Sequence, residues 1–112
     1  MNSQCPSIIV EIEWLRDEMA KASRIQIPSA ASFGTTGYRE SESIDELFSV
    51  FVRVLDFSSG DHKVPLRAQV FPLVEQMADR LPGHKNDIFI LTAGRTKLAR
   101  CRVLEVIPPS IA

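Results

Sequence analysis

The stretch from Asp87 to Ile107, DIFILTAGRTKLARCRVLEVI, carries the clearest information about the fold. It holds an apolar run rich in β-branched and aromatic residues, Ile88 to Leu91, and a second run from Cys101 to Ile107. The turn Ala93-Gly94-Arg95-Thr96 lies between the two runs. Two short strand-forming runs around a glycine-containing turn predict a β-hairpin. Pro108 follows at once, and a proline ends a strand because it has no N–H to donate.

Three earlier segments also alternate apolar and polar residues, the pattern of a half-buried strand. They are Ile8 to Leu15, Phe48 to Leu55, and Val64 to Phe71. A further short strand or sheet edge is predicted at Ile25 and Ile27. Several short strands separated by polar turns predict an all-β protein, a small closed or nearly closed antiparallel β-barrel of about six strands.

The connecting segments predict turns, loops and little helix. Ser29 to Tyr38 is rich in Ser, Ala, Gly and Thr and is interpreted as a loop. Ser41 to Glu46 begins with a capping residue and predicts a helical turn. Arg16 to Arg24 fits a helical turn or a loop, and Val74 to Leu81 fits a brief helix, since Leu73, Met77 and Leu81 are spaced four apart.

Length and composition indicate one soluble globular domain over residues 1–112. Apolar residues make up 45% of the chain and charged residues 24%. No apolar run approaches the roughly 20 residues that span a bilayer, and no secretory signal is visible at the start. Cys5 and Cys101 belong to no Cys-x-x-Cys pair. We therefore expect reduced thiols, a cytoplasmic location and no membrane association.

The net charge of −1 conceals an uneven distribution along the chain. Residues 1–60 hold 5 Lys/Arg and 9 Asp/Glu, a balance of −4, whereas residues 61–112 hold 8 and 5, a balance of +3. Such a division can give an acidic face and a basic face. In a small barrel, strands from both halves interleave, so a mixed surface is the preferred expectation.

These elements, in their order, resemble the C-terminal barrel domain of elongation factor Tu and its relatives. The likeness is best from Gly60 to Ile107 and looser over the rest of the chain. Its most recognisable motifs are Gly37-Tyr38-Arg39 and Gly94-Arg95-Thr96. The further counterparts are Val10 to Leu15, Gly60-Asp61, Val64 to Phe71, Glu75 to Arg80, Ile88 to Leu91 and Cys101 to Ile107.

The sequence departs from this family at two motifs and in one larger respect. Glu40 follows Arg39 where the family commonly has proline, and Lys97-Leu98-Ala99-Arg100 replaces small residues and glycines. There is also no Gly-x-x-x-x-Gly-Lys-Ser/Thr phosphate loop, so no GTP binding is expected. The resemblance therefore implies a barrel that keeps only a binding surface; the parent domain helps to hold transfer RNA and a partner protein.

The search for catalytic residues finds no constellation. His62 and His84 lie in turn-like segments beside lysines, and no nucleophile is paired with either. Cys101 falls in the inward register of its strand and is expected to be a buried, inert thiol. Glu11 and Glu13 are interpreted as a solvated strand face. We expect no catalytic residue, no cofactor and no metal site.

Two surfaces are the candidates for binding. Arg95, Lys97, Arg100 and Arg102 gather on the closing hairpin, and a positive stripe can neutralise phosphates. Phe33, Tyr38 and Arg39 lie in the glycine-containing segment, which is either a recognition loop or a plug for one end of the barrel.

Three hypotheses for function follow, in descending order of preference. The first is a protein-binding module, self-association included, that uses a hairpin or an exposed strand edge. The second is an RNA-binding module that uses the basic hairpin, although the sequence lacks interleaved aromatic residues for base stacking. The third is an enzyme with a site at the mouth of the barrel.

Overall fold

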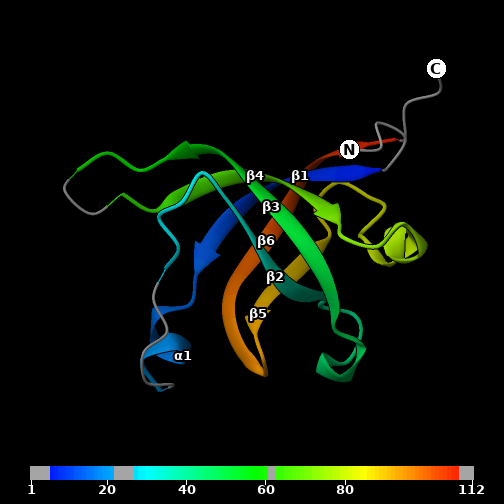
Figure 1. The fold of residues 1–112 in the computed structure, drawn as a ribbon, viewed down its shortest axis with the longest axis horizontal. Coiled ribbons are helices and arrows are strands. Elements are labelled where there is room, and N and C mark those ends of the chain that lie inside the picture. The colour runs from blue at the N-terminus through cyan, green and yellow to red at the C-terminus, as the bar shows by residue number, and fades with distance from the viewer. Residues whose placement is uncertain (1–5, 22–26, 61–62, 109–112) are drawn as a thin grey trace.

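Six segments of the chain form β-strands. The computed structural model describes residues 6–21, 27–60 and 63–108. The strands are β1 (Ser7–Trp14), β2 (Ser32–Arg39), β3 (Phe48–Phe57), β4 (Pro65–Pro72), β5 (Ile88–Ala93) and β6 (Thr96–Ile107). They close into one antiparallel barrel in the order β1-β4-β3-β2-β5-β6, with β6 paired to β1 (Figure 1). The predicted all-β, six-stranded closed barrel is confirmed.

The core lies inside the barrel and is filled by alternate residues of the strands. On β1, for example, Ile8, Val10 and Ile12 are buried while Glu11 and Glu13 are exposed, as the period-two pattern predicted. The remaining members of the core cluster are Met19, Phe48, Val50, Val52, Ala68, Val70, Leu81, Phe89, Leu91, Leu98, Ala99, Cys101 and Val103.

The closing hairpin has the predicted turn but a longer second strand than predicted. Gly94 is the first of two loop residues and has φ 59°, as a type II′ turn requires at that position. β6 begins at Thr96 rather than at Cys101. The register shifts between Leu91 and Thr92, and Leu98 and Ala99 are buried in succession. This irregularity breaks the apolar–polar alternation, so the first part of β6 does not show the period-two pattern of a strand.

The loop predicted over Ser29 to Tyr38 is wrong, because most of it is strand β2, which pairs with both β3 and β5. Gly37 explains why this polar, glycine-containing segment is a strand. A Cβ atom there would lie 2.5 Å from the Phe89 ring and 2.8 Å from the Ile90 carbonyl oxygen. The missing side chain lets the β2 backbone approach Phe89 closely enough to close the barrel. Of the predicted short strand, Ile27 is irregular and Ile25 lies outside the described residues.

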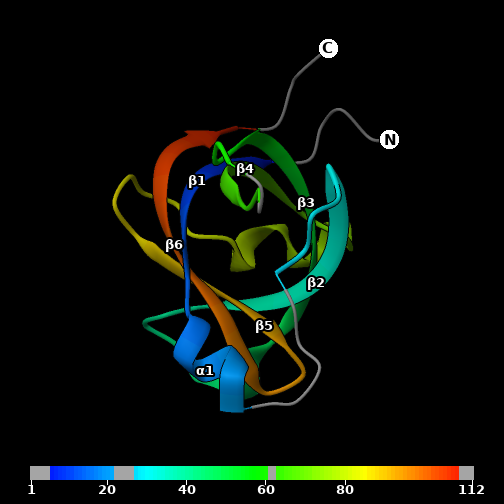
Figure 2. The same ribbon diagram turned by 90° about the vertical axis from the view of Figure 1, so that its left-hand side faces the viewer.

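Short helical segments pack at the two ends of the barrel. The α-helix α1 (Arg16–Lys21) packs beside β6 and buries Met19. The 3₁₀ segment η2 (Glu75–Arg80) replaces the predicted brief helix, and its Met77 packs against the core. Figure 2 shows η2 across the far end of the barrel. The predicted helical turn after β2 is the 3₁₀ segment η1 (Ile44–Glu46), capped by Ser43 rather than Ser41.

A test of barrel closure is the Gly37→Ala variant. We expect it to lower the free energy of unfolding by about 2 kcal/mol or more, since the added methyl group meets an aromatic ring and a carbonyl that cannot both move away. Urea denaturation measures this. Gly34→Ala on the same strand is the matched control, because its nearest neighbouring atoms are 3.9 Å away. Equal stability of the two variants would contradict the close approach.

Candidate functional site

The predicted basic stripe on the closing hairpin is opposed by carboxylates. Arg100 lies 3.0 Å from Glu40, Arg102 lies 2.8 Å from Glu11, and Arg95 lies 3.0 Å from Asp45. Arg102 also donates a hydrogen bond to the Asn86 side chain. Hydrogen bonding to Glu40 raises the pKa of Arg100. Lys97 is exposed and has no carboxylate within 4.0 Å among the described residues. The three arginines therefore present little net positive charge to a polyanion.

The two halves of the chain, oppositely charged in sequence, neutralise each other in space. Five ion pairs join a basic residue from the second half to an acidic residue from the first half. They are Arg67–Asp56, Arg80–Glu46, Arg95–Asp45, Arg100–Glu40 and Arg102–Glu11. The mixed surface expected from interleaved strands is what the barrel presents.

The candidate loop surface is dispersed, because its residues lie on strand β2. Phe33 packs against the core. Tyr38 is only 5% exposed and pairs with the buried Ile90 of β5. Arg39 is half-buried and bonds Glu42 at 2.7 Å, which raises the pKa of Arg39 and lowers that of Glu42. These three residues do not form one exposed recognition surface.

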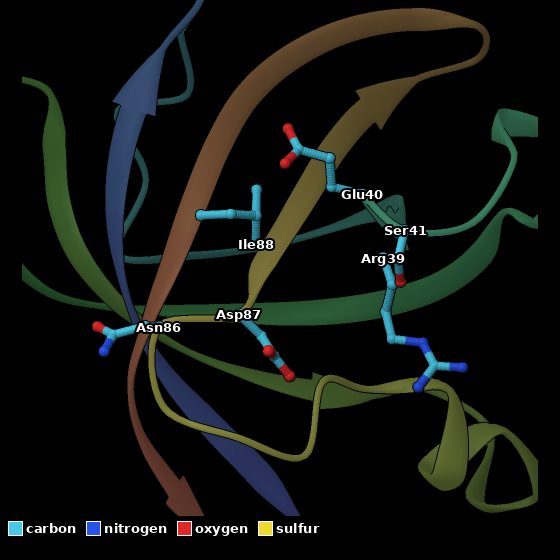
Figure 3. A pocket seen from close by; sticks show the side chains of 6 residues that line it. All are labelled: Arg39, Glu40, Ser41, Asn86, Asp87 and Ile88. Carbon is cyan, nitrogen blue, oxygen red and sulfur yellow. The ribbon is translucent and has the colours of Figure 1, made fainter.

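Arg39 does line a hollow of about 370 Å³ between the end of β2 and the start of β5. Figure 3 shows Arg39 and Asp87 on facing sides of this hollow, with Asn86 pointing away. The other lining residues are Glu40, Ser41 and Ile88. The hollow is polar and open. The backbone N–H of His84 donates to Asp87 at 3.2 Å, but the His84 side chain is 89% exposed. The lining therefore offers polar contacts rather than an assembled nucleophile and base.

Cys101 is fully buried, and desolvation raises the pKa of its thiol far above the ordinary value. It lies beside Ala99 and Val103 in the inward register, as predicted. The thiol therefore stays protonated and shielded from solvent reagents. Within the described residues, no group of three or more His, Cys, Asp and Glu side chains could hold a metal ion.

The outward side of β3 and β4 was not predicted as a site, and it carries partly exposed apolar side chains. Phe51 and Phe71 are cross-strand partners with ring centroids 6.4 Å apart. Leu73 follows β4 and is 54% exposed. Its Cδ1 atom lies 3.9 Å from the place a Cβ would take at Gly34, so it leans over the bare β2 backbone. The guanidinium of Arg53 lies 5.6 Å from the Phe71 centroid. We call Phe51, Arg53, Phe71 and Leu73 the β3–β4 face.

A signal for the β3–β4 face was present in the sequence. Phe51 and Arg53 occupy the polar phase of the β3 alternation, and Phe71 occupies that of β4. An aromatic residue in the polar phase of two neighbouring strands indicates an apolar outer surface. Strand pairing between β3 and β4 was needed to bring the two aromatic residues together.

No family model matches this chain, and no curated protein or solved structure matches it. The resemblance to the elongation factor Tu barrel therefore stays a prediction. In the portion of the chain that the structure describes, no helix is long and apolar enough to cross a membrane.

Burial of Cys101 predicts a specific pH dependence of stability. The thiol stays protonated when folded but ionises above about pH 8.5 when unfolded, so the unfolded state binds fewer protons at high pH. In a Cys5→Ser background we expect the free energy of unfolding to fall by about 1.4 kcal/mol per pH unit above that point. Urea denaturation between neutral pH and pH 10 measures it, and Cys101→Ala, measured in parallel, should lack this contribution. Identical pH slopes in both proteins would contradict the buried thiol.

The paired arginines predict that the unchanged protein does not bind RNA measurably. Polyuridine should not bind measurably at physiological salt, because carboxylates oppose Arg95, Arg100 and Arg102. Glu11→Gln with Glu40→Gln should create weak, salt-dependent binding in a fluorescence anisotropy titration. Tight binding of polyuridine by the unchanged protein would instead support the RNA hypothesis. Its affinity should then fall steeply with salt and be lost in Arg100→Ala/Arg102→Ala.

Proposed function

We propose that this barrel is a protein-binding module and that its binding surface is the β3–β4 face. The observation that carries the proposal is the location of exposed apolar residues. Each large hydrophobic side chain that is strongly exposed in the described residues lies on β3, on β4 or directly after β4. They are Leu55 at 44%, Leu66 at 41%, Leu73 at 54% and Val74 at 48% exposed. Leu73, the most exposed of them, belongs to the β3–β4 face, and exposed apolar surface is a usual mark of an interaction site.

The make-up of the β3–β4 face supports the same proposal. Aromatic and arginine side chains dominate the energetic centres of protein interfaces. Phe51, Phe71 and Arg53 are of these types, Phe71 lies beside both of the others, and the exposed Leu73 extends the surface. The rest of the barrel wall has mixed charges held in ion pairs, for example Arg102 with Glu11, and Arg67 with Asp56 at the far end of β3 and β4. Such pairs are costly to desolvate and suit a solvated surface.

Closure of the barrel limits how a protein partner can contact it. Each of the six strands has a neighbour on both sides over part of its length, so no strand is an open edge throughout, and a partner that adds a strand to the sheet is disfavoured. We therefore propose that the partner contacts side chains on the outer surface of a hairpin, rather than backbone groups at a strand edge. The hairpin is β3–β4 rather than the closing hairpin β5–β6. Figure 1 shows it extending to one side of the barrel.

Site-specific photo-crosslinking tests the proposal. A benzophenone amino acid at position 73 is expected to crosslink a discrete partner in an extract of the source cells, because Leu73 is exposed beside two aromatic rings. Phe71→Ala in the same protein should remove that product. A product of twice the mass of the chain would identify the partner as a second copy.

The matched control carries the photo-crosslinker at position 97, where Lys97 is exposed on β6, away from the β3–β4 face. A product that forms equally well from position 97, or that survives Phe71→Ala, would overturn the proposal. So would the absence of any discrete product from position 73.

A further inference from the structure

Arg53 is fixed in place by a chain of hydrogen bonds that begins in the buried part of the barrel wall. Its Nη2 atom donates to Oε1 of Gln69, the cross-strand partner of Arg53 on β4. The Nε2 atom of Gln69 in turn donates to the Ser7 hydroxyl at 2.8 Å. Gln69 is 9% exposed and Ser7 is 2% exposed. Because the amide nitrogen is directed to Ser7, the amide oxygen is left to accept from Arg53.

The Phe71 ring holds the other side of this arginine. The guanidinium carbon lies 5.6 Å from the ring centroid, within the range of a cation–π contact. A flexible arginine loses side-chain entropy when a partner immobilises it. Arg53 is already ordered by Phe71 and Gln69, although it remains exposed to solvent. Its geometry is therefore prepared for a ligand before the ligand arrives.

The charge of Arg53 is not compensated within the described residues. Six of the eight arginines there have a carboxylate within 4.0 Å, and only Arg16 and Arg53 have none. Arg16 is exposed at the start of α1, and within the described residues it makes no cation–π contact with an aromatic ring. Among the arginines that the structure describes, Arg53 is the one that combines an uncompensated charge with neighbouring aromatic and aliphatic side chains.

We propose that Arg53 receives a carboxylate of the partner, so that the partner presents an aspartate or glutamate next to apolar side chains. This inference rests on the proposed protein-binding function of the β3–β4 face. One guanidinium N–H is used by Gln69, and the remaining N–H groups can bond a carboxylate with charge assistance. Phe51, Phe71 and Leu73 receive the apolar neighbours of that acid. Ser7 and Gln69 act as positioning residues.

Selection from a phage-displayed library of random peptides tests this inference. Peptides are selected on the unchanged protein and counter-selected on Phe71→Ala. We expect the retained sequences to share an Asp or Glu beside apolar residues. Changing that acid to its amide in a synthetic peptide should weaken binding to the unchanged protein about tenfold. Binding to Arg53→Met, which has an unbranched apolar side chain but no charge, should not change with the same replacement.

Two further variants separate charge from structure. Gln69→Glu places a carboxylate beside Arg53 within the same chain and should remove the preference for acidic peptides while leaving the fold intact. Arg102→Met removes an arginine already paired with Glu11 and should leave that preference unchanged.

The outcomes distinguish this inference from the proposed function. Two results would overturn the acidic partner and leave the protein-binding proposal in place. In the first, the selected peptides need Phe71 but carry no acid. In the second, changing the peptide acid to its amide weakens binding to Arg53→Met as much as binding to the unchanged protein. A selection in which no peptide prefers the unchanged protein over Phe71→Ala would overturn both.

Discussion

The close contact between the Gly37 backbone and the Phe89 ring is the constraint on which this barrel depends. β2 and β5 are distant in sequence, and their pairing is the connection that brings β2 and β3 against the closing hairpin. A side chain at position 37 would hold the two strands apart. With the contact made, Phe89 is fully buried and packs edge-on against Phe48 at 5.7 Å. Without it, β2 and β5 would each have an exposed edge.

Closure also decides how charge is distributed. Strands of the acidic first half pair with strands of the basic second half at β1–β4, β3–β4, β2–β5 and β1–β6, and five ion pairs connect the two halves. Exposed pairs of this kind contribute little stability individually. Their larger effect is to leave no broad electropositive surface on the closing hairpin. Arg53 differs because the cross-strand neighbour that it bonds is the neutral Gln69. Its charge is therefore directed outward rather than opposed.

The β3–β4 face is not explained by the needs of the fold. The core is filled from inside the barrel, and the outward Phe51, Phe71 and Leu73 contribute to packing only in part. Exposed apolar surface lowers solubility and favours association. A buried Ser7–Gln69 pair that ends on a surface arginine adds a second feature that the core does not require. Both features are accounted for if the face binds another protein.

Period-two alternation in the sequence was enough to predict β1, β3 and β4, and two strand-forming runs around a glycine-containing turn predicted the closing hairpin. Together they predicted the all-β class and the inward position of Cys101. Each of these depends on residues near one another in the chain. β2 was missed because glycine and threonine replace the apolar residues of an ordinary strand, and the start of β6 was missed because Leu98 and Ala99 are buried in succession. Only the tertiary structure decided that Tyr38 is buried, that the basic stripe is paired and that Phe51, Arg53 and Phe71 meet on one surface. These properties depend on which strands become neighbours, and that is set by contacts such as Gly37 with Phe89 between residues far apart in the chain.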